Sequence, residues 1–243
     1  MRYAIPHKGA KAMKLQDLLT QTKPQLVFMD CDGVIFDTNA LKCDGFRVAL
    51  EAYPKDEVEA LVAHHRRTGG VSRYLKFEKF FREIHPVDDP EAAMKLALTR
   101  FASHVEPGFA RMRPRPEALA FAELFGGPDR VYVVSGSDEE ELRRVFEHQE
   151  LEHRFVAIHG SPVGKKAHLR RLLDRHGVKS RDALFIGDGW GDWDASRALD
   201  VPFIFLAEMS HWDEGHTTIA QSPGPMATAE TWAELLDTVR RTR

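Results

Sequence analysis

Short apolar runs alternate with segments of helical periodicity throughout the second half of the chain. Such runs, bounded by polar and glycine residues, are typical of buried strands in a parallel sheet, with helices as the crossover connections. The pattern predicts an α/β fold with a Rossmann-like parallel sheet that helices cover on both faces. The strands are expected at residues 130–134, 155–158, 183–186 and 202–206, and the helices at 116–125, 137–148, 164–176, 190–199 and 232–239.

The first half of the chain has a different pattern. Residues 26–29 predict a first strand, but from residue 39 to 112 the hydrophobic positions recur only at helical spacing. We therefore expect a helical domain at 39–112, inserted into an α/β core formed by residues 1–38 and 113–243. Its four helices are marked by apolar side chains within residues 46–53, 58–65, 77–84 and 94–105.

Capping residues indicate where several helices begin. Ser72 is expected to cap the third helix of the inserted domain, and Asp89 to cap the fourth, with Pro90 at its first position. In the core, Ser137 and Glu140 have the spacing of a capping box. The helix after the second strand is therefore expected to begin at Ser137.

Two carboxylates stand where the first strand ends. Asp30 and Asp32 are followed directly by Gly33. Two carboxylates close to apolar surroundings are costly unless a positive charge lies nearby, and Mg²⁺ is the simplest candidate because it prefers oxygen ligands. The alternative is an ordinary turn after a strand, where Asp and Gly are common.

Polar residues also follow three later strands. Ser135 and Gly136 follow the second, two lysines at 165 and 166 follow the third, and Asp188 follows the fourth, with Asp192 one helical turn later. Ligands of parallel α/β sheets bind beyond the carboxyl ends of the strands, so these side chains are expected to converge. Each group has a plainer alternative: a helix cap, a solvated lysine pair or a turn.

Composition narrows the class of protein. The chain has 243 residues, 43% hydrophobic and 29% charged, with a net charge of -3. This balance gives no electrostatic footprint for nucleic acid, and no apolar stretch reaches the length of a membrane span. Two cysteines are too few for a disulfide framework, and the histidines show no zinc spacing. We expect a soluble cytoplasmic protein, with no nucleic-acid or membrane partner and an oligomeric state left open.

The sequence Asp30-Cys-Asp32-Gly-Val-Ile-Phe-Asp-Thr resembles the first motif of the haloacid dehalogenase (HAD) superfamily, and the later groups resemble its other three motifs in order. The resemblance covers the whole core. It implies that Asp30 is the nucleophile, Asp32 the general acid and base, and Ser135 a ligand of the phosphoryl oxygens. Lys165 is the preferred active-site lysine, and Lys166 stays open as the alternative.

The same resemblance implies a magnesium site and further contacts. Asp30, a backbone carbonyl of Asp32 and Asp188 would hold Mg²⁺, while Asp192 would act through water or fix the lysine. The backbone amides near Gly33 and Gly136 would bind phosphoryl oxygens.

The inserted helices resemble the family's helical cap, in the branch that includes phosphoglycolate phosphatases and β-phosphoglucomutases. In such relatives the linker between the second and third cap helices sets substrate specificity. Arg73, beside two glycines in this linker, is the expected substrate contact. The resemblance implies a Mg²⁺-dependent phosphatase acting on a small phosphate ester, such as a sugar phosphate or phosphoglycolate. A phosphomutase and a non-catalytic phosphate-binding module are the alternatives.

Overall fold

The computed structural model describes residues 12–242, so the first eleven residues of the expected core segment lie outside it. Six parallel strands form one sheet in the order β3-β2-β1-β4-β5-β6. The strands are β1 (Leu26–Met29), β2 (Val131–Asp138), β3 (Ala157–Ser161), β4 (Ala183–Gly187), β5 (Phe203–Leu206) and β6 (Met226–Ala229). The expected parallel α/β sheet is confirmed, with β1 near its centre.

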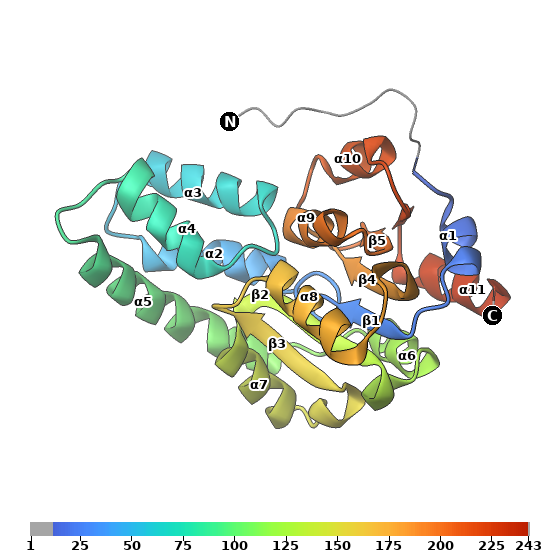
Figure 1. Ribbon diagram of the computed structural model, residues 1–243. Helices are drawn as coiled ribbons and strands as arrows, with labels where there is room; N and C mark the ends of the chain where they lie inside the picture. The colour runs from blue at the N-terminus through green and yellow to red at the C-terminus, as the bar shows by residue number, and fades with distance from the viewer. Residues whose placement is uncertain (1–11, 243) are drawn as a thin grey trace.

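Helices cover both faces of the sheet (Figure 1). Side chains alternate between faces along a strand, so Val27 and Met29 of β1 pack into one hydrophobic cluster while Leu26 and Phe28 pack into another. The first cluster includes apolar residues of α1 (Leu15–Gln21), α6 (Pro116–Leu124), α7 (Glu139–His148) and α11 (Trp232–Thr242). The second includes residues of α8 (Lys165–His176), α9 (Trp190–Leu199) and α10 (Gly215–Gln221).

The helical cap lies to one side of the sheet (Figure 1). It consists of α2 (Asn39–Ala49), α3 (Lys55–Arg67), α4 (Arg73–Lys79) with a following π-helical turn (Phe80–Ile84), and α5 (Pro90–Arg111). Aromatic rings fill its interior: the ring centroid of Phe46 lies 5.2 Å from that of Phe77 and 4.8 Å from that of Phe101. The exact domain boundaries at 39 and 112 stay a prediction.

The cap and the core share one apolar cluster. Phe36, from the loop after β1, contacts Phe109 of α5 with ring centroids 5.1 Å apart, and Phe146 of α7 at 5.7 Å. The C-terminal part of α5 is therefore packed firmly on the core.

Two of the expected helix starts are confirmed and one is wrong. Ser72 accepts a hydrogen bond from the Tyr74 amide, and Asp89 caps α5 by accepting one from the Ala92 amide. The capping box at Ser137 does not form, because β2 continues to Asp138 through an irregular register with β3. Asp138 caps α7 instead, accepting a hydrogen bond from the Glu141 amide at 2.9 Å.

The segment between β5 and α11, where the sequence pattern predicts no strand or helix, contains two elements, α10 and β6. β6 is the strand at the edge of the sheet, with the sequence Met-Ala-Thr-Ala. Alanine has a low preference for strands, and the preceding Ser, Pro and Gly residues are typical of turns. β6 therefore forms because it pairs with β5, and its local sequence does not predict a strand.

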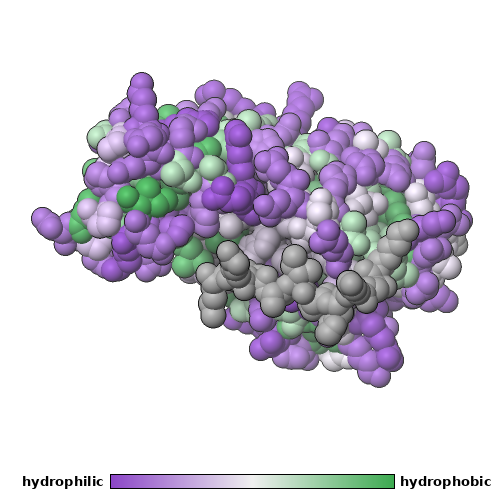
Figure 2. Space-filling view, turned by 90° about the horizontal axis from the view of Figure 1, so that it is seen from above, coloured by the Kyte–Doolittle hydropathy of each residue, from purple (hydrophilic) through white to green (hydrophobic). Residues whose placement is uncertain are grey.

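Apolar side chains on the surface are scattered. Figure 2 shows a face that is mostly hydrophilic, with apolar residues in small patches. Within residues 12–242, none of the helices combines the length and apolar character needed to cross a bilayer. Cys31 and Cys43 are buried thiols that form no disulfide bond.

Candidate active site

Polar side chains gather at the carboxyl ends of the central strands, as expected for a parallel sheet. Asp30 follows β1, Ser135 lies near the end of β2, Asp188 follows β4, and Lys165 begins α8. These four residues are separated widely in the sequence, yet all four are buried. The strand order brings β1, β2 and β4 side by side, and this adjacency concentrates the polar groups at one place.

Three carboxylates form the most acidic part of the site. Asp30, Asp188 and Asp192 each contribute one oxygen, and these oxygens lie within 4.8 Å of one another. Burial, followed by the nearby charges of Asp30 and Asp192, raises the pKa of Asp188 well above its ordinary value. Asn39 of α2 donates a hydrogen bond to Oδ2 of Asp188 at 2.8 Å. Buried carboxylate oxygens that repel one another are a fitting donor set for a hard divalent cation such as Mg²⁺.

Lys165 faces this acidic cluster. Its Nζ lies 2.7 Å from Oδ2 of Asp30 and 2.5 Å from Oδ1 of Asp192. Burial alone would lower the pKa of Lys165, but the two carboxylates raise it above its usual value. Lys166 is exposed on α8. Of the two candidate lysines, the structure brings only Lys165 to the carboxylates.

Asp192 is held from two sides. Besides its contact with Lys165, its Oδ2 accepts a hydrogen bond from the Gly189 amide at 3.1 Å. This second bond fixes the start of α9 relative to the loop that carries Asp188. Asp192 thus contacts Lys165 directly, while its expected role, fixing the lysine or acting through water, stays a prediction.

Asp32 has its own set of partners beside the acidic cluster. It pairs with Lys42 and accepts hydrogen bonds from the Ser137 hydroxyl at 2.6 Å and from the Thr38 hydroxyl. Burial would raise the pKa of Asp32, but Lys42 and the hydroxyl donors hold it well below its usual range. The Ser135 hydroxyl donates to Asp32 Oδ2 at 3.2 Å and accepts from the Ser137 amide. Ser135 therefore lies in the site with its hydroxyl directed at Asp32.

Gly33 allows a close approach of chain segments. Its φ is +69°, which favours glycine, and a Cβ added there would lie 2.0 Å from Oδ2 of Asp188. Its amide donates to the Phe36 carbonyl at 2.8 Å. The role of Gly33 in this structure is thus to admit the Asp188 carboxylate, while its expected contact with phosphate stays a prediction.

The cap linker contacts the core through glycines. A Cβ added to Gly136 would lie 2.2 Å from the carbonyl oxygen of Gly70, and one added to Gly189 would lie 2.7 Å from the backbone of Gly69. The Gly191 amide donates a hydrogen bond to the Gly69 carbonyl at 2.8 Å. Only glycines, which lack a side chain, let the backbones of the linker and the core come this close. The contact itself shows that the cap is closed over the site.

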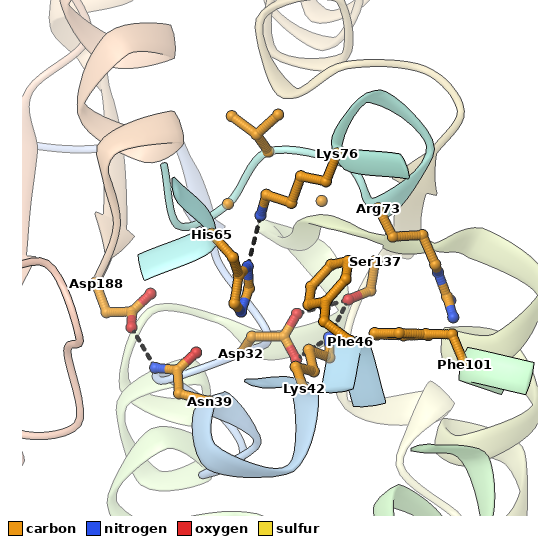
Figure 3. Close-up of a pocket in the computed structure, with 13 residues that line it drawn as sticks. Asp32, Asn39, Lys42, Phe46, His65, Arg73, Lys76, Phe101, Ser137 and Asp188 are labelled. Atoms are coloured by element: carbon orange, nitrogen blue, oxygen red, sulfur yellow. Dashed lines mark hydrogen bonds and ion pairs between the residues drawn. The ribbon is translucent and has the colours of Figure 1, made fainter. Parts of the chain in front are cut away.

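A cavity of about 40 Å³ remains between the cap and the core (Figure 3). Cap residues form one side, and Asp32, Ser137 and Asp188 belong to the core side. Phe46, Phe101, Val71 and the glycines complete its wall. A water molecule needs a cavity volume of roughly 10–15 Å³, so the closed cavity holds only a few waters.

Arg73, the expected substrate contact, lies in the wall of this cavity with its charge paired. Its guanidinium donates to Oε2 of Glu141 at 2.6 Å and lies over the ring of Phe101. Figure 3 shows Arg73 beside Phe101 and away from Asp188. The ion pair between Arg73 and Glu141 joins α4 to α7. This pairing accounts for the burial of Arg73 without a ligand.

Sequence reasoning gave no site role to five polar residues of the cavity: Asn39, Lys42, His65, Lys76 and Ser137. One signal was available. Lys42 precedes Phe46 by four positions, and Lys76 precedes Phe80 by four, so each lysine lies on the apolar stripe of its helix. A charged residue on a buried stripe needs a polar environment, and here that environment is the site.

The loop after β5 supports the Asp188 loop. The Ser210 hydroxyl donates to the Asp188 carbonyl at 2.5 Å, and Asn39 donates to the Met209 carbonyl at 2.8 Å. This loop had no assigned role from sequence. Its position explains how Asp188 is held although it lies beyond the end of its strand.

One family of proteins matches most of the chain. The profile of the haloacid dehalogenase-like hydrolases matches residues 24–200. No curated protein sequence matches the chain.

Several solved structures share the fold. A hydrolase from Pseudomonas syringae is 17% identical, with a TM-score of 0.72 over 89% of this chain and 98% of its own. A predicted phosphoglycolate phosphatase from Haemophilus somnus is 16% identical, with a TM-score of 0.69 over 89% and 98%. A haloacid dehalogenase-like family protein from Streptococcus pneumoniae is 15% identical, with a TM-score of 0.65 over 88% and 98%.

Proposed function

The chain belongs to the haloacid dehalogenase-like hydrolases, and from this membership we propose that it is a Mg²⁺-dependent phosphatase of small phosphate esters. The observation that carries the proposal is the convergence of Asp30, Lys165 and Asp188 in one buried cluster, with Asp32 beside it. The proposed reaction needs a nucleophilic carboxylate, a second carboxyl group for proton transfer, and positive charge around the phosphoryl group.

Asp30 is the proposed nucleophile. Its Oδ1 accepts a hydrogen bond from the Cys31 amide at 2.7 Å, and its Oδ2 contacts Lys165, so the carboxylate is held in one orientation. Attack on phosphorus breaks the ester P–O bond and forms an aspartyl-phosphate. Water then attacks that phosphorus, which releases inorganic phosphate and restores Asp30.

Asp32 is the proposed general acid and base. It gives a proton to the departing alkoxide and takes one from the attacking water, so the proton count balances over the cycle. In the closed structure Lys42 keeps Asp32 ionised. Lys42 belongs to the cap helix α2, so we infer that cap movement or substrate binding withdraws it and lets Asp32 take up its proton.

Mg²⁺ fits the acidic cluster. Asp30 and Asp188 would hold it, with Asp192 nearby, and it would neutralise these carboxylates and polarise the phosphoryl oxygens. Lys165 contributes positive charge beside Asp30. Ser135 and the amide of Gly136 are the proposed contacts for the remaining phosphoryl oxygens.

The cap would select the substrate. The closed cavity of about 40 Å³ is smaller than a phosphate ester, so substrate access requires the glycine linker to move away from the core. Reclosure around a small ester would exclude water from the phosphoryl group. These features favour a small metabolite over a phosphoprotein.

The test is release of inorganic phosphate from a panel of phosphorylated metabolites, measured with Mg²⁺ and with a chelator. We expect Mg²⁺-dependent release by the wild type and a loss of roughly 10⁴-fold or more in Asp30→Asn, because the variant lacks the nucleophile. Turnover that needs a bisphosphate primer and releases no phosphate would identify the phosphomutase alternative. Phosphate binding without turnover of any ester would identify the non-catalytic alternative.

A further inference from the structure

Two neighbouring residues of the cap helix α4 bind two side chains at the start of the core helix α7. The Arg73 guanidinium donates a hydrogen bond to Oε2 of Glu141 at 2.6 Å. The Tyr74 hydroxyl donates one to Oδ2 of Asp138, also at 2.6 Å. We call this pair of contacts the cap latch, because each of them joins the cap to the core.

The core half of the cap latch is fixed by α7 itself. Asp138 caps this helix, and its Oδ1 accepts a hydrogen bond from the Glu141 amide at 2.9 Å while Oδ2 binds Tyr74. Carboxylates at the start of a helix are also favoured by the helix dipole. The two acceptors therefore keep their places on the core whether or not the cap is closed.

The other half of the cap latch moves with the cap. The guanidinium of Arg73 lies over the ring of Phe101, 4.9 Å from its centroid, and Phe101 packs against Phe46 and Phe77 in the cap interior. Figure 3 shows Arg73 beside Phe101, at the end of the cavity away from Asp188. Opening of the cap must therefore separate Arg73 from Glu141.

The cap latch lies next to the closest backbone contact between the cap and the core. Gly70 precedes Arg73 by three positions, and Gly136 precedes Asp138 by two. The carbonyl oxygen of Gly70 is the atom that a Cβ at Gly136 would meet. Glycines have no side chain to bury, so this contact contributes little hydrophobic stabilisation. The charged and hydroxyl groups of the cap latch are the side chains that hold the linker in place.

The ion pair of the cap latch is strong but incompletely bonded. The side chains of Arg73 and Glu141 are only 8% and 2% exposed, and a charge left alone at such a place is costly. This cost favours the closed cap. However, Oε1 of Glu141 is buried, and no group within residues 12–242 donates a hydrogen bond to it. Water would satisfy this oxygen on opening, which offsets part of the loss and makes the contact reversible.

The second contact of the cap latch is available over the physiological range of pH. Burial, and then the hydrogen bond to Asp138, raises the pKa of Tyr74 to about 12. The phenol therefore keeps its proton and donates it to the Asp138 carboxylate. Hydrogen bonds to charged groups are stronger than those between neutral groups.

We propose that the cap latch holds the cap closed in the resting protein, with Glu141 and Asp138 as core positioning residues that must release Arg73 and Tyr74 before the site opens. The latch itself requires no catalysis. Its consequence rests on the proposed phosphatase function: the closed cavity does not admit a phosphate ester, so an ester enters only after the latch has opened.

The amide of Gly191 reports on cap opening without any substrate. It lies in the first turn of α9, where amides have no acceptor within the helix, and it donates to the Gly69 carbonyl of the cap linker at 2.8 Å. Cap opening breaks this bond. Hydrogen exchange of this amide, measured by NMR, therefore follows the opening equilibrium. The amide of Val27, which donates to the Arg130 carbonyl at 3.0 Å inside the core, is the reference.

We expect the Gly191 amide of the wild type to exchange more slowly than an unprotected amide and faster than the Val27 amide. Glu141→Gln should accelerate Gly191 exchange roughly 10- to 100-fold, because Arg73 then has no charged partner in the closed state. Tyr74→Phe removes one hydrogen bond and should accelerate it roughly 3- to 10-fold. Exchange of the Val27 amide should change much less in both variants.

Glu106→Gln is the matched control. Glu106 of α5 also pairs across the joint, with Arg144 of α7, but these side chains are 39% and 55% exposed. The same change from carboxylate to amide should alter Gly191 exchange less than about threefold, because exposed ion pairs contribute little.

A double variant tests whether Arg73 and Glu141 act as a pair. Arg73→Met and Glu141→Gln each leave one buried group without its partner, whereas the combination leaves neither charge. Exchange of the Gly191 amide in the double variant should therefore be slower than the product of the two single accelerations predicts. Fully multiplicative accelerations would show that the two side chains act independently and would overturn the pairing.

Three further results overturn the cap latch. The first is unchanged Gly191 exchange in Glu141→Gln or in Tyr74→Phe. The second is equal acceleration of the Gly191 and Val27 amides, which would mean that the contacts stabilise the whole fold and not the closed cap. The third is an acceleration in Glu106→Gln as large as that in Glu141→Gln. Each of these leaves the phosphatase function standing, and a failure to hydrolyse any ester leaves the exchange result intact.

Discussion

The Lys165 ammonium lies 2.7 Å from a carboxylate oxygen of Asp30, while the next residue, Lys166, is exposed. Lys165→Met should therefore reduce kcat/KM by roughly 100- to 1000-fold, as expected when one stabilising donor of a reacting charge is removed. Lys166→Met should change it less than about threefold, because exposed charges contribute little. Steady-state kinetics on one ester checks both variants. A larger loss of kcat/KM in Lys166→Met than in Lys165→Met would identify Lys166 as the active-site lysine instead.

Mg²⁺ should stabilise the protein more at pH 8 than at pH 5.5. Without a cation, the folded pKa of Asp188 is raised by burial and by Asp30 and Asp192, so the folded state binds more protons than the unfolded state above pH of about 4. The free energy of unfolding then falls as pH rises, until Asp188 is ionised. Bound Mg²⁺ relieves the repulsion between the ionised carboxylates, so it should stabilise the fold most at pH 8. At pH 5.5 protons compete with Mg²⁺ for the same carboxylate oxygens, so its effect should be smaller.

Thermal unfolding with and without Mg²⁺ at the two pH values measures this effect. Asp188→Asn removes one of the repelling carboxylates, so it should lessen both the pH dependence and the stabilisation by Mg²⁺. An equal Mg²⁺ effect at both pH values in the wild type would contradict the assignment of Asp188 to the metal site.

Removal of Lys42 should destabilise the protein in a pH-dependent way. Lys42 holds the pKa of Asp32 below its usual range, so this pair stabilises the folded state at neutral pH. In Lys42→Met the Asp32 carboxylate, whose side chain is only 15% exposed, loses its cation, at a cost of about 3 kcal/mol at pH 7. Burial then raises the pKa of Asp32, so protonation removes much of the cost as pH falls toward about 4.

Urea unfolding of the wild type and Lys42→Met at pH 7 and pH 4 tests this prediction. Lys79→Met is the control, since its ion pair with Glu83 is partly exposed and should be worth less than about 1 kcal/mol. A difference between wild type and Lys42→Met that is the same at both pH values would show that Asp32 does not depend on Lys42.

A methyl group at Gly136 should obstruct cap closure. A Cβ there would lie 2.2 Å from the Gly70 carbonyl oxygen, so the linker must move back. We expect Gly136→Ala to lower kcat/KM by roughly 10- to 100-fold, because small misplacements of a closing segment weaken catalysis strongly. Gly164→Ala is the matched control, because a Cβ at Gly164 meets no atom within 4 Å. Equal activity of the two variants would exclude this closed contact from the catalytic cycle.

The sequence predicts those parts of the fold that depend on residues close together in the chain. The run at 26–29 is apolar throughout and is followed by Asp30, so both the strand and the polar edge are visible in the sequence. The parallel sheet then dictates that Asp30, Ser135 and Asp188 lie together, because their strands end at one edge.

The parts that escape prediction depend on contacts between distant segments. Lys42 and Lys76 enter the site only because the cap folds back onto the core, and helical periodicity does not show what a helix faces. Likewise, Ser137 has the spacing of a cap, but pairing with β3 extends β2 to Asp138 and moves the helix start. The ion pair of Arg73 with Glu141, sixty-eight positions later, is likewise invisible in the sequence, while the expected contact of Arg73 with the substrate stays a prediction.

The central position of β1 has a consequence for how the chain reaches this structure during synthesis. Val27 pairs with Val131 on one side and with Leu184 on the other. This strand therefore cannot complete its pairing until most of the polypeptide has emerged from the ribosome. Pairings so remote in sequence close large loops and slow the search for the native topology. We therefore expect nascent chains that end before β4 to keep β1 exposed and to need chaperones, while the cap helices, whose contacts are local, form early.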